Sequence, residues 1–135
     1  MVTMSAVYAG GLHCELTHGP SGSTLETDAP KDNMGRGERF SPTDLVGAAL
    51  AACALTTMAI AAERDGVDLR GARAEVSKEM VADPLRRIGA LPLTLTLPKS
   101  VPAEKRAKLE NAARACPVHK SLNPALKAEI SFVYE

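Results

Sequence analysis

The first 29 residues alternate between apolar and polar positions in short runs. Gly10-Gly11 and Gly19-Pro20-Ser21-Gly22 separate these runs as turns. Alternation of this kind is typical of strands, because successive side chains of a strand point to opposite faces. We therefore expect a three-stranded antiparallel meander at the start of the chain.

Residues 41–64 predict one long helix. Ser41 can accept a hydrogen bond from the first turn, Pro42 suits the first helical position, and Asp44 can reach back with its carboxylate. No charge interrupts residues 45–62. A helix without a polar face has to be buried all round, so we expect the rest of the chain to wrap it. A membrane span would have about this length, but the many Ala and Thr residues favour a buried helix of a soluble protein.

Alternation returns after Gly66, which supplies a left-handed helix cap. Residues 70–81 and 85–97 each predict a strand. The second strand places four leucines on one face: Leu91, Leu93, Leu95 and Leu97. Pro92 within this run favours an edge position or a bulge, because proline cannot donate to a neighbouring strand.

The last third of the chain predicts a second helix, one more helical turn and a strand. Residues 103–115 form an amphipathic pattern that ends at Cys116, because Pro117 disfavours helical geometry at the residue before it. Residues 118–122 predict a helical turn, and residues 126–134 alternate as a strand. The order of elements indicates an α+β fold.

The composition indicates the number of domains, the kinds of partner and the cellular compartment. A chain of 135 residues with 45% hydrophobic residues fits a single domain, residues 1–135, with a real core. Only 3% of residues are aromatic, so the core consists of small side chains that bury little area each, and we expect an oligomer. Sixteen basic and sixteen acidic residues cancel, so we expect no nucleic-acid or membrane partner. The start of the chain does not resemble a signal peptide, so we expect a cytoplasmic protein. Three cysteines, an odd number, do not suggest a structural disulfide framework, and in a reducing compartment we expect them to be free, catalytic or metal-binding.

A polar loop, residues 28–40, precedes the long helix and carries Arg36, Glu38 and Arg39. One interpretation is a solvated connection. The other is that the loop lies over the end of the helix and lines a site. The residues alone leave both interpretations open.

Cys53 and Cys116 carry the chemistry with most potential in this chain. A thiol is nucleophilic as its thiolate, which a nearby cation favours. Cys53 lies in the middle of its predicted helix, where the helix dipole does little for the thiol, so a cation from elsewhere would be needed. The candidates for that cation are Arg36, Arg39 and His119. A cysteine in an alanine-rich helix is more often inert core than nucleophile, so the residues alone also allow the inert interpretation.

No metal or cofactor site is expected. Cys116-Pro117-Val118-His119 has the spacing of half a zinc site, but the sequence offers no second pair of ligands. Cys14, in a predicted strand, is interpreted as a small hydrophobic residue. Fingerprints for phosphate or dinucleotide binding are absent from the sequence.

Two motifs resemble the OsmC/Ohr superfamily of osmotically inducible and organic-hydroperoxide-resistance proteins. They are Ser41-Pro42-Thr43-Asp44-Leu45 with the Ala-rich run to Cys53, and Cys116-Pro117-Val118-His119-Lys120-Ser121-Leu122. The resemblance implies antiparallel sheets wrapped around a long buried central helix. It also implies an intertwined homodimer with two sites at its interface.

The same resemblance implies a thiol peroxidase that acts on organic hydroperoxides. Cys53 would be the peroxidatic cysteine and Cys116 the resolving one, with an external dithiol as reductant and no cofactor. The alternative is a non-catalytic relative that binds a small apolar ligand or senses redox state.

The sequence departs from the peroxidase pattern at the start of the long helix. Characterised members carry a glutamate directly after the proline, paired with an arginine of the N-terminal strands. Here Thr43 occupies that position, and the predicted N-terminal strands contain no arginine. We expect Arg36 or Arg39 to supply the cation, held by Glu38 or Asp44.

Overall fold

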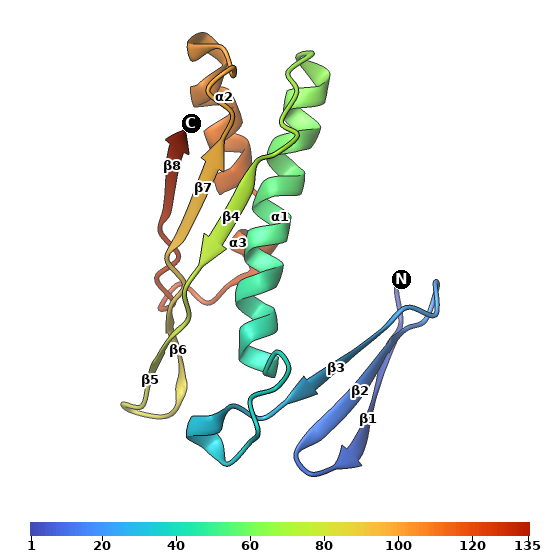
Figure 1. Cartoon of the computed structure of the whole chain (residues 1–135). Helices are drawn as coiled ribbons and strands as arrows, with labels where there is room; N and C mark the ends of the chain where they lie inside the picture. The colour runs from blue at the N-terminus through green and yellow to red at the C-terminus, as the bar shows by residue number, and fades with distance from the viewer. The chain divides into compact units, whose positions relative to one another are not determined.

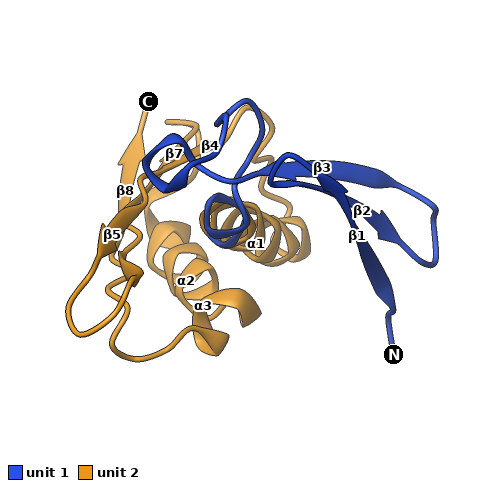
Figure 2. Cartoon of the chain, turned by 90° about the horizontal axis from the view of Figure 1, so that it is seen from below, with its two compact units in different colours: residues 1–46 blue, residues 47–135 orange.

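The computed structural model describes residues 1–135 and has a mixed α+β architecture (Figure 1). The chain divides into two compact units, residues 1–46 and 47–135, which Figure 2 shows in different colours. The boundary falls inside the long helix α1 (Pro42–Arg64). That the whole chain is one domain stays a prediction.

Unit 1 begins with the expected meander. Its strands are β1 (Met4–Gly10), β2 (His13–His18) and β3 (Thr24–Asp28), paired antiparallel in the order β1-β2-β3. The loop that follows contains a short 3₁₀ helix, η1 (Lys31–Asn33), which buries no residue. Two β2–β3 pairs in this register bring charged residues opposite each other: His13 with Asp28, and Glu15 with Glu26.

A reciprocal capping box starts α1, as the sequence predicts. The Asp44 backbone N–H donates to Ser41 Oγ at 3.1 Å, and the Ser41 backbone N–H donates to Asp44 Oδ2 at 2.9 Å. Both donors would otherwise lack a partner within the helix. Ser41 is 1% exposed, so water cannot replace these bonds.

The prediction that α1 is buried all round is wrong for the chain alone. Buried positions recur every three or four residues along one face of α1: Gly47, Leu50, Ala54, Met58 and Ala62. Another face remains exposed, with Ala49, Ala52, Thr56 and Ile60. One chain therefore covers only one face of a helix that is apolar on nearly every face. By length and composition alone α1 would also be long and apolar enough to cross a membrane.

Unit 2 contains a mixed sheet with strand order β4 (Arg73–Val76), β7 (Leu93–Leu97) and β8 (Ile130–Tyr134). The α1 and α2 (Ala103–Arg114) helices lie on one face of this sheet (Figures 1 and 2). The four leucines of the predicted face are all buried. Glycine at position 47 lets α1 pack closely against Leu91, because a Cβ at this position would lie 3.3 Å from Leu91 Cδ2.

Three strand predictions need correction. The predicted strand 70–81 is split into β4 and β5 (Glu79–Val81), and the strand 85–97 is split into β6 (Arg87–Ala90) and β7. Strands β5 and β6 form their own two-stranded sheet. Pro92 marks the break between β6 and β7, because it has no N–H to continue the pairing, and β7 is a central strand rather than an edge strand.

The last strand differs from the prediction in extent and direction. It begins at Ile130 rather than Leu126, and it runs parallel to β7. The expectation that all sheets are antiparallel is therefore wrong for the pair β7–β8. The helical predictions before it are confirmed, since α2 ends at Arg114 and α3 (Pro117–Ser121) follows.

Candidate functional site

The two cysteines of the predicted pair meet in unit 2. Cys53 lies in the middle of α1, and Cys116 lies between α2 and α3. Pro117 forces this arrangement, because Cys116 takes an extended conformation (φ −60°, ψ 142°) and Pro117 then begins α3. The Cys53 side chain is near enough to Cys116 to raise the pKa of the Cys116 thiol, and both thiols are free.

Cys116 is the enclosed member of the pair. Its side chain is 0% exposed, and its Sγ accepts the His119 backbone N–H at 3.3 Å as the cap of α3. Burial raises the pKa of the Cys116 thiol, and the neighbouring Cys53 side chain raises it further, while the His119 N–H opposes both. Cys116 is therefore held as a neutral thiol at neutral pH.

Cys53 is the more accessible member. It is only partly buried, and its Sγ lies 3.9 Å from the hydroxyl oxygen of Thr57, one turn further along α1. The pair thus joins a partly exposed cysteine to a buried one.

That the His119 ring supplies a cation for Cys53 stays a prediction; in this structure the ring contacts the segment before β8. Its Nε2 lies 3.1 Å from the carbonyl oxygen of Ala128, which can only accept, so the ring N–H donates there. The contact between His119 and Cys116 is made by the backbone N–H instead. His119 therefore helps to hold the loop before β8 and caps the thiol through its main chain.

The expected partner of Arg39 is corrected. Arg39 Nε donates to Glu26 Oε2 at 3.2 Å, and a terminal nitrogen of its guanidinium reaches only the backbone oxygen of Glu38, at 3.5 Å. Asp44 has its own role in the capping box of α1. Glu26 was not among the expected partners, because its place beside Arg39 depends on the loop folding back along β3, where the Asp28 backbone N–H donates to the Phe40 carbonyl oxygen at 3.2 Å.

Thr43, at the position where a glutamate was expected, also belongs to the start of the helix. Its Oγ1 lies 3.2 Å from Ser41 Oγ. Residues 41, 43 and 44 thus form one polar cap, and the structure gives Asp44 a structural function independent of any role at the thiols.

The polar loop lines a cavity of about 400 Å³ whose lining residues all belong to unit 1. The loop contributes Arg36, Glu38 and Arg39, and the strands contribute His13 and Asp28 among others. The loop thus borders a hollow within unit 1, and that it lies over the end of the helix and lines a site stays a prediction.

His13 is a polar centre that the sequence reasoning missed. Its Nδ1 lies 2.7 Å from Asp28 Oδ1, and its Nε2 lies 3.3 Å from Glu26 Oε1. The hydrogen bond with Asp28 raises the pKa of His13, and the same bond lowers that of Asp28. Alternation places His13, Glu15 and Thr17 on one face of β2, so the signal was present, but pairing with β3 was needed to complete the group.

The fold and the cysteines define a class of small α+β proteins in which one cysteine lies in a long helix and a second lies near it, before a short helix. Residues 35–131 match the family model described as OsmC-like protein, which is most of the chain. The chain belongs to the OsmC-like family. No curated protein matches the chain.

Solved structures agree with this assignment. A protein of Psychrobacter arcticus 273-4, provisionally described as an osmotic stress induced and detoxification response protein, is 38% identical with a TM-score of 0.91, covering 98% of this chain and 96% of its own. The organic hydroperoxide resistance protein OsmC of Legionella pneumophila is 18% identical (TM-score 0.75; 98% and 96% covered). The organic hydroperoxide resistance protein OhrB of Bacillus subtilis is 19% identical (TM-score 0.69; 98% and 97% covered). The last two similarities concern the fold.

Proposed function

We propose that the protein is a cysteine-based peroxidase that reduces organic hydroperoxides. The observation that carries this proposal is the pairing of Cys53 with Cys116, one accessible and one fully enclosed. Two cysteines 63 positions apart in the sequence (116 − 53) become neighbours only through the fold. The names of family members from Legionella pneumophila and Bacillus subtilis, which describe organic hydroperoxide resistance, support the choice of substrate.

The proposed reaction has three balanced steps. The Cys53 thiolate attacks one oxygen of the hydroperoxide, the O–O bond breaks, and the alcohol leaves after taking a proton, so that Cys53 becomes a sulfenic acid. The Cys116 thiol condenses with this sulfenic acid, which forms the disulfide and releases water. An external dithiol then reduces the disulfide by thiol exchange and is itself oxidised to a disulfide.

Turnover with cumene hydroperoxide and a dithiol tests the proposal. Cys53→Ser should abolish peroxide consumption, and Cys116→Ser should let Cys53 oxidise irreversibly, because nothing then captures its sulfenic acid. Cys14→Ser is the matched control and should retain full turnover. Peptide mass mapping after one equivalent of peroxide should find a Cys53–Cys116 disulfide with Cys14 free. Absence of peroxide consumption, together with a Cys53 that resists alkylation in the folded protein, would contradict the proposal and favour a binding or structural role.

A second test addresses the groups that activate Cys53. Arg36 and Arg39 are the candidate cations, and Glu26 fixes Arg39. If Arg39 activates Cys53, Arg39→Ala should slow both the alkylation of Cys53 and peroxide turnover, and Glu26→Gln should reproduce part of this effect. Unchanged alkylation and unchanged turnover in both Arg36→Ala and Arg39→Ala would remove the arginines from the mechanism.

We further propose that the protein acts as a homodimer in the cytoplasm. One face of α1 is exposed in the single chain, with Ile60 49% exposed. One face of the N-terminal sheet also carries exposed Met4 and Tyr8. Burial of such apolar surface favours association. Light scattering coupled to size exclusion should give twice the mass of 14.2 kDa, and a monomer at micromolar concentration would refute the dimer.

A further inference from the structure

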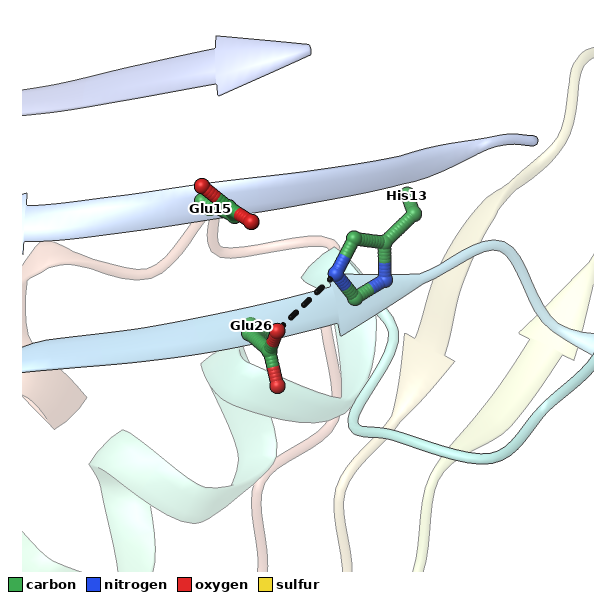
Figure 3. Close-up of side chains that lie close together, drawn as sticks. All are labelled: His13, Glu15 and Glu26. Carbon is green, nitrogen blue, oxygen red and sulfur yellow. Dashed lines mark hydrogen bonds and ion pairs between the residues drawn. The ribbon is translucent and has the colours of Figure 1, made fainter. Parts of the chain in front are cut away.

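A group of potential metal ligands lies on one face of the N-terminal sheet. His13 and Glu15 come from β2, and Glu26 comes from the neighbouring strand β3 (Figure 3). One ligand atom of each residue lies within 4.8 Å of the others. His13 and Glu15 are two positions apart on β2 and so share a face, and the antiparallel register places Glu26 directly opposite Glu15.

The spacing suits a metal with short ligand bonds. His13 Nε2 and Glu26 Oε1 are 3.3 Å apart. Two ligands at about 2.0–2.1 Å from a tetrahedral zinc ion would be about 3.3–3.4 Å apart. Glu15 is exposed on the same face, so its carboxylate can move toward the ion without disturbing the sheet. Water would complete the coordination.

Asp28 holds the histidine ring in the orientation that a ligand needs. Its Oδ1 lies 2.7 Å from His13 Nδ1, and its Oδ2 accepts the Glu38 backbone N–H at 3.2 Å. The Asp28 side chain is only 8% exposed, so this arrangement is well fixed. A carboxylate on one ring nitrogen keeps the proton there and leaves the other nitrogen to the metal, as in many metal sites.

The charges of the group leave room for a cation. Glu15, Glu26 and Asp28 bring three negative charges, and the nearest guanidinium, that of Arg39, brings one positive charge to Glu26. A metal would take the place of a proton between His13 Nε2 and Glu26 Oε1, which leaves the ring neutral and the sum at minus two, and a divalent ion would balance that charge. Imidazole with carboxylates is a donor set for zinc and similar transition metals rather than for calcium.

We propose that His13, Glu15 and Glu26 bind a divalent transition metal ion of the zinc class, with Asp28 as a positioning residue. This site is separate from the thiol pair and independent of the proposed peroxidase function. It lies on the strand face opposite to that of Cys14, since neighbouring residues of a strand alternate in direction.

Calorimetric titration of the full chain with Zn²⁺ tests the site. The parent protein should bind one equivalent of Zn²⁺. His13→Gln and Glu26→Gln should each lower the Zn²⁺ affinity at least tenfold. His18→Gln is the matched control, because His18 belongs to the same strand but bonds to Ser21, and it should bind as the parent does. Glu15→Gln changes an exposed residue, so it should weaken binding without affecting folding.

Two further readouts make the outcome decisive. Asp28→Asn should keep the stoichiometry but lower the affinity by about 10–100-fold, and imidazole ¹⁵N NMR should show the His13 proton no longer fixed on Nδ1. Equal Zn²⁺ affinity in the parent, His13→Gln and Glu15→Gln would overturn the proposal. Zinc binding that disappears only with Cys53→Ser or Cys116→Ser would overturn it as well, because the thiols would then be the ligands.

Discussion

The capping box at the start of α1 allows a quantitative test of what Asp44 does. Ser41→Ala removes the acceptor of the Asp44 N–H, and Ser41 is almost fully buried, so water cannot replace it. Loss of such a cap costs about 0.5–2 kcal/mol, and burial of Ser41 places the expected loss at about 1–2 kcal/mol. For a chain of this size that corresponds to a fall in Tm of roughly 4–8 °C.

Substitutions at Asp44 separate capping from catalysis. Asp44→Ala removes the acceptor of the Ser41 N–H and should cost about 1 kcal/mol, while Asp44→Asn keeps an acceptor oxygen and loses only the charge near the helix N-terminus, at about 0.3–1 kcal/mol. The double variant Ser41→Ala/Asp44→Ala should cost less than the sum, because the two bonds form one unit. If Asp44 also activates Cys53, Asp44→Asn will lower peroxide turnover far more than it lowers stability.

Urea unfolding followed by circular dichroism, at one fixed protein concentration, measures these free energies. Ser23→Ala, in an exposed turn, is the matched control and should change stability by less than about 0.5 kcal/mol. A loss below about 0.3 kcal/mol in Ser41→Ala, or strictly additive effects in the double variant, would refute the capping argument.

Three further predictions concern unit 2. Iodoacetamide should label Cys53 at least tenfold faster than Cys116, because Cys116 is enclosed and its thiol pKa is raised; equal rates by peptide mapping would contradict this. The hydrogen bond from Lys108 lowers the pKa of the Asp65 carboxyl from its usual 3.8. The ionised Asp65 therefore stabilises the folded protein above pH 3.8, and this contribution is lost as the pH falls through the lowered pKa. Urea unfolding at pH 7 and 3 should show a smaller acid loss in Asp65→Asn. Leu95→Ala, at a fully buried position, should cost about 2–5 kcal/mol, and a loss below 1 kcal/mol by urea unfolding would contradict the assigned core.

Local signals in the sequence predicted the parts of the fold that local chemistry determines. The capping residues defined the start of α1, and Pro117 defined the end of the second helix at Cys116. The alternation of leucines identified the buried face of β7. Each of these features depends on residues within one or two turns of each other, so no knowledge of the tertiary structure is needed.

The predictions were wrong where the structure depends on contacts between segments that are distant in the sequence. Whether β8 pairs parallel or antiparallel with β7 depends on the path of the chain through α2 and α3, which no alternation pattern encodes. The exposed face of α1 has a similar origin. The composition of α1 indicates that its apolar surface must be covered. It does not indicate whether the same chain or a second chain covers that surface.

The site residues follow the same division. The chemistry of Cys53 and Cys116 could be named from their surroundings, but only the fold makes the enclosed thiol of one adjacent to the accessible thiol of the other. Arg39 was assigned to carboxylates close to it in sequence, whereas its partner Glu26 lies thirteen positions away and is reached because the loop folds back along β3. The β2–β3 register forms the group around His13 by placing Glu26 opposite Glu15. The ion pair of Arg39 and the proposed metal site therefore share the Glu26 carboxylate through different oxygens, Oε2 toward Arg39 and Oε1 toward His13, and neither contact follows from residues close in sequence.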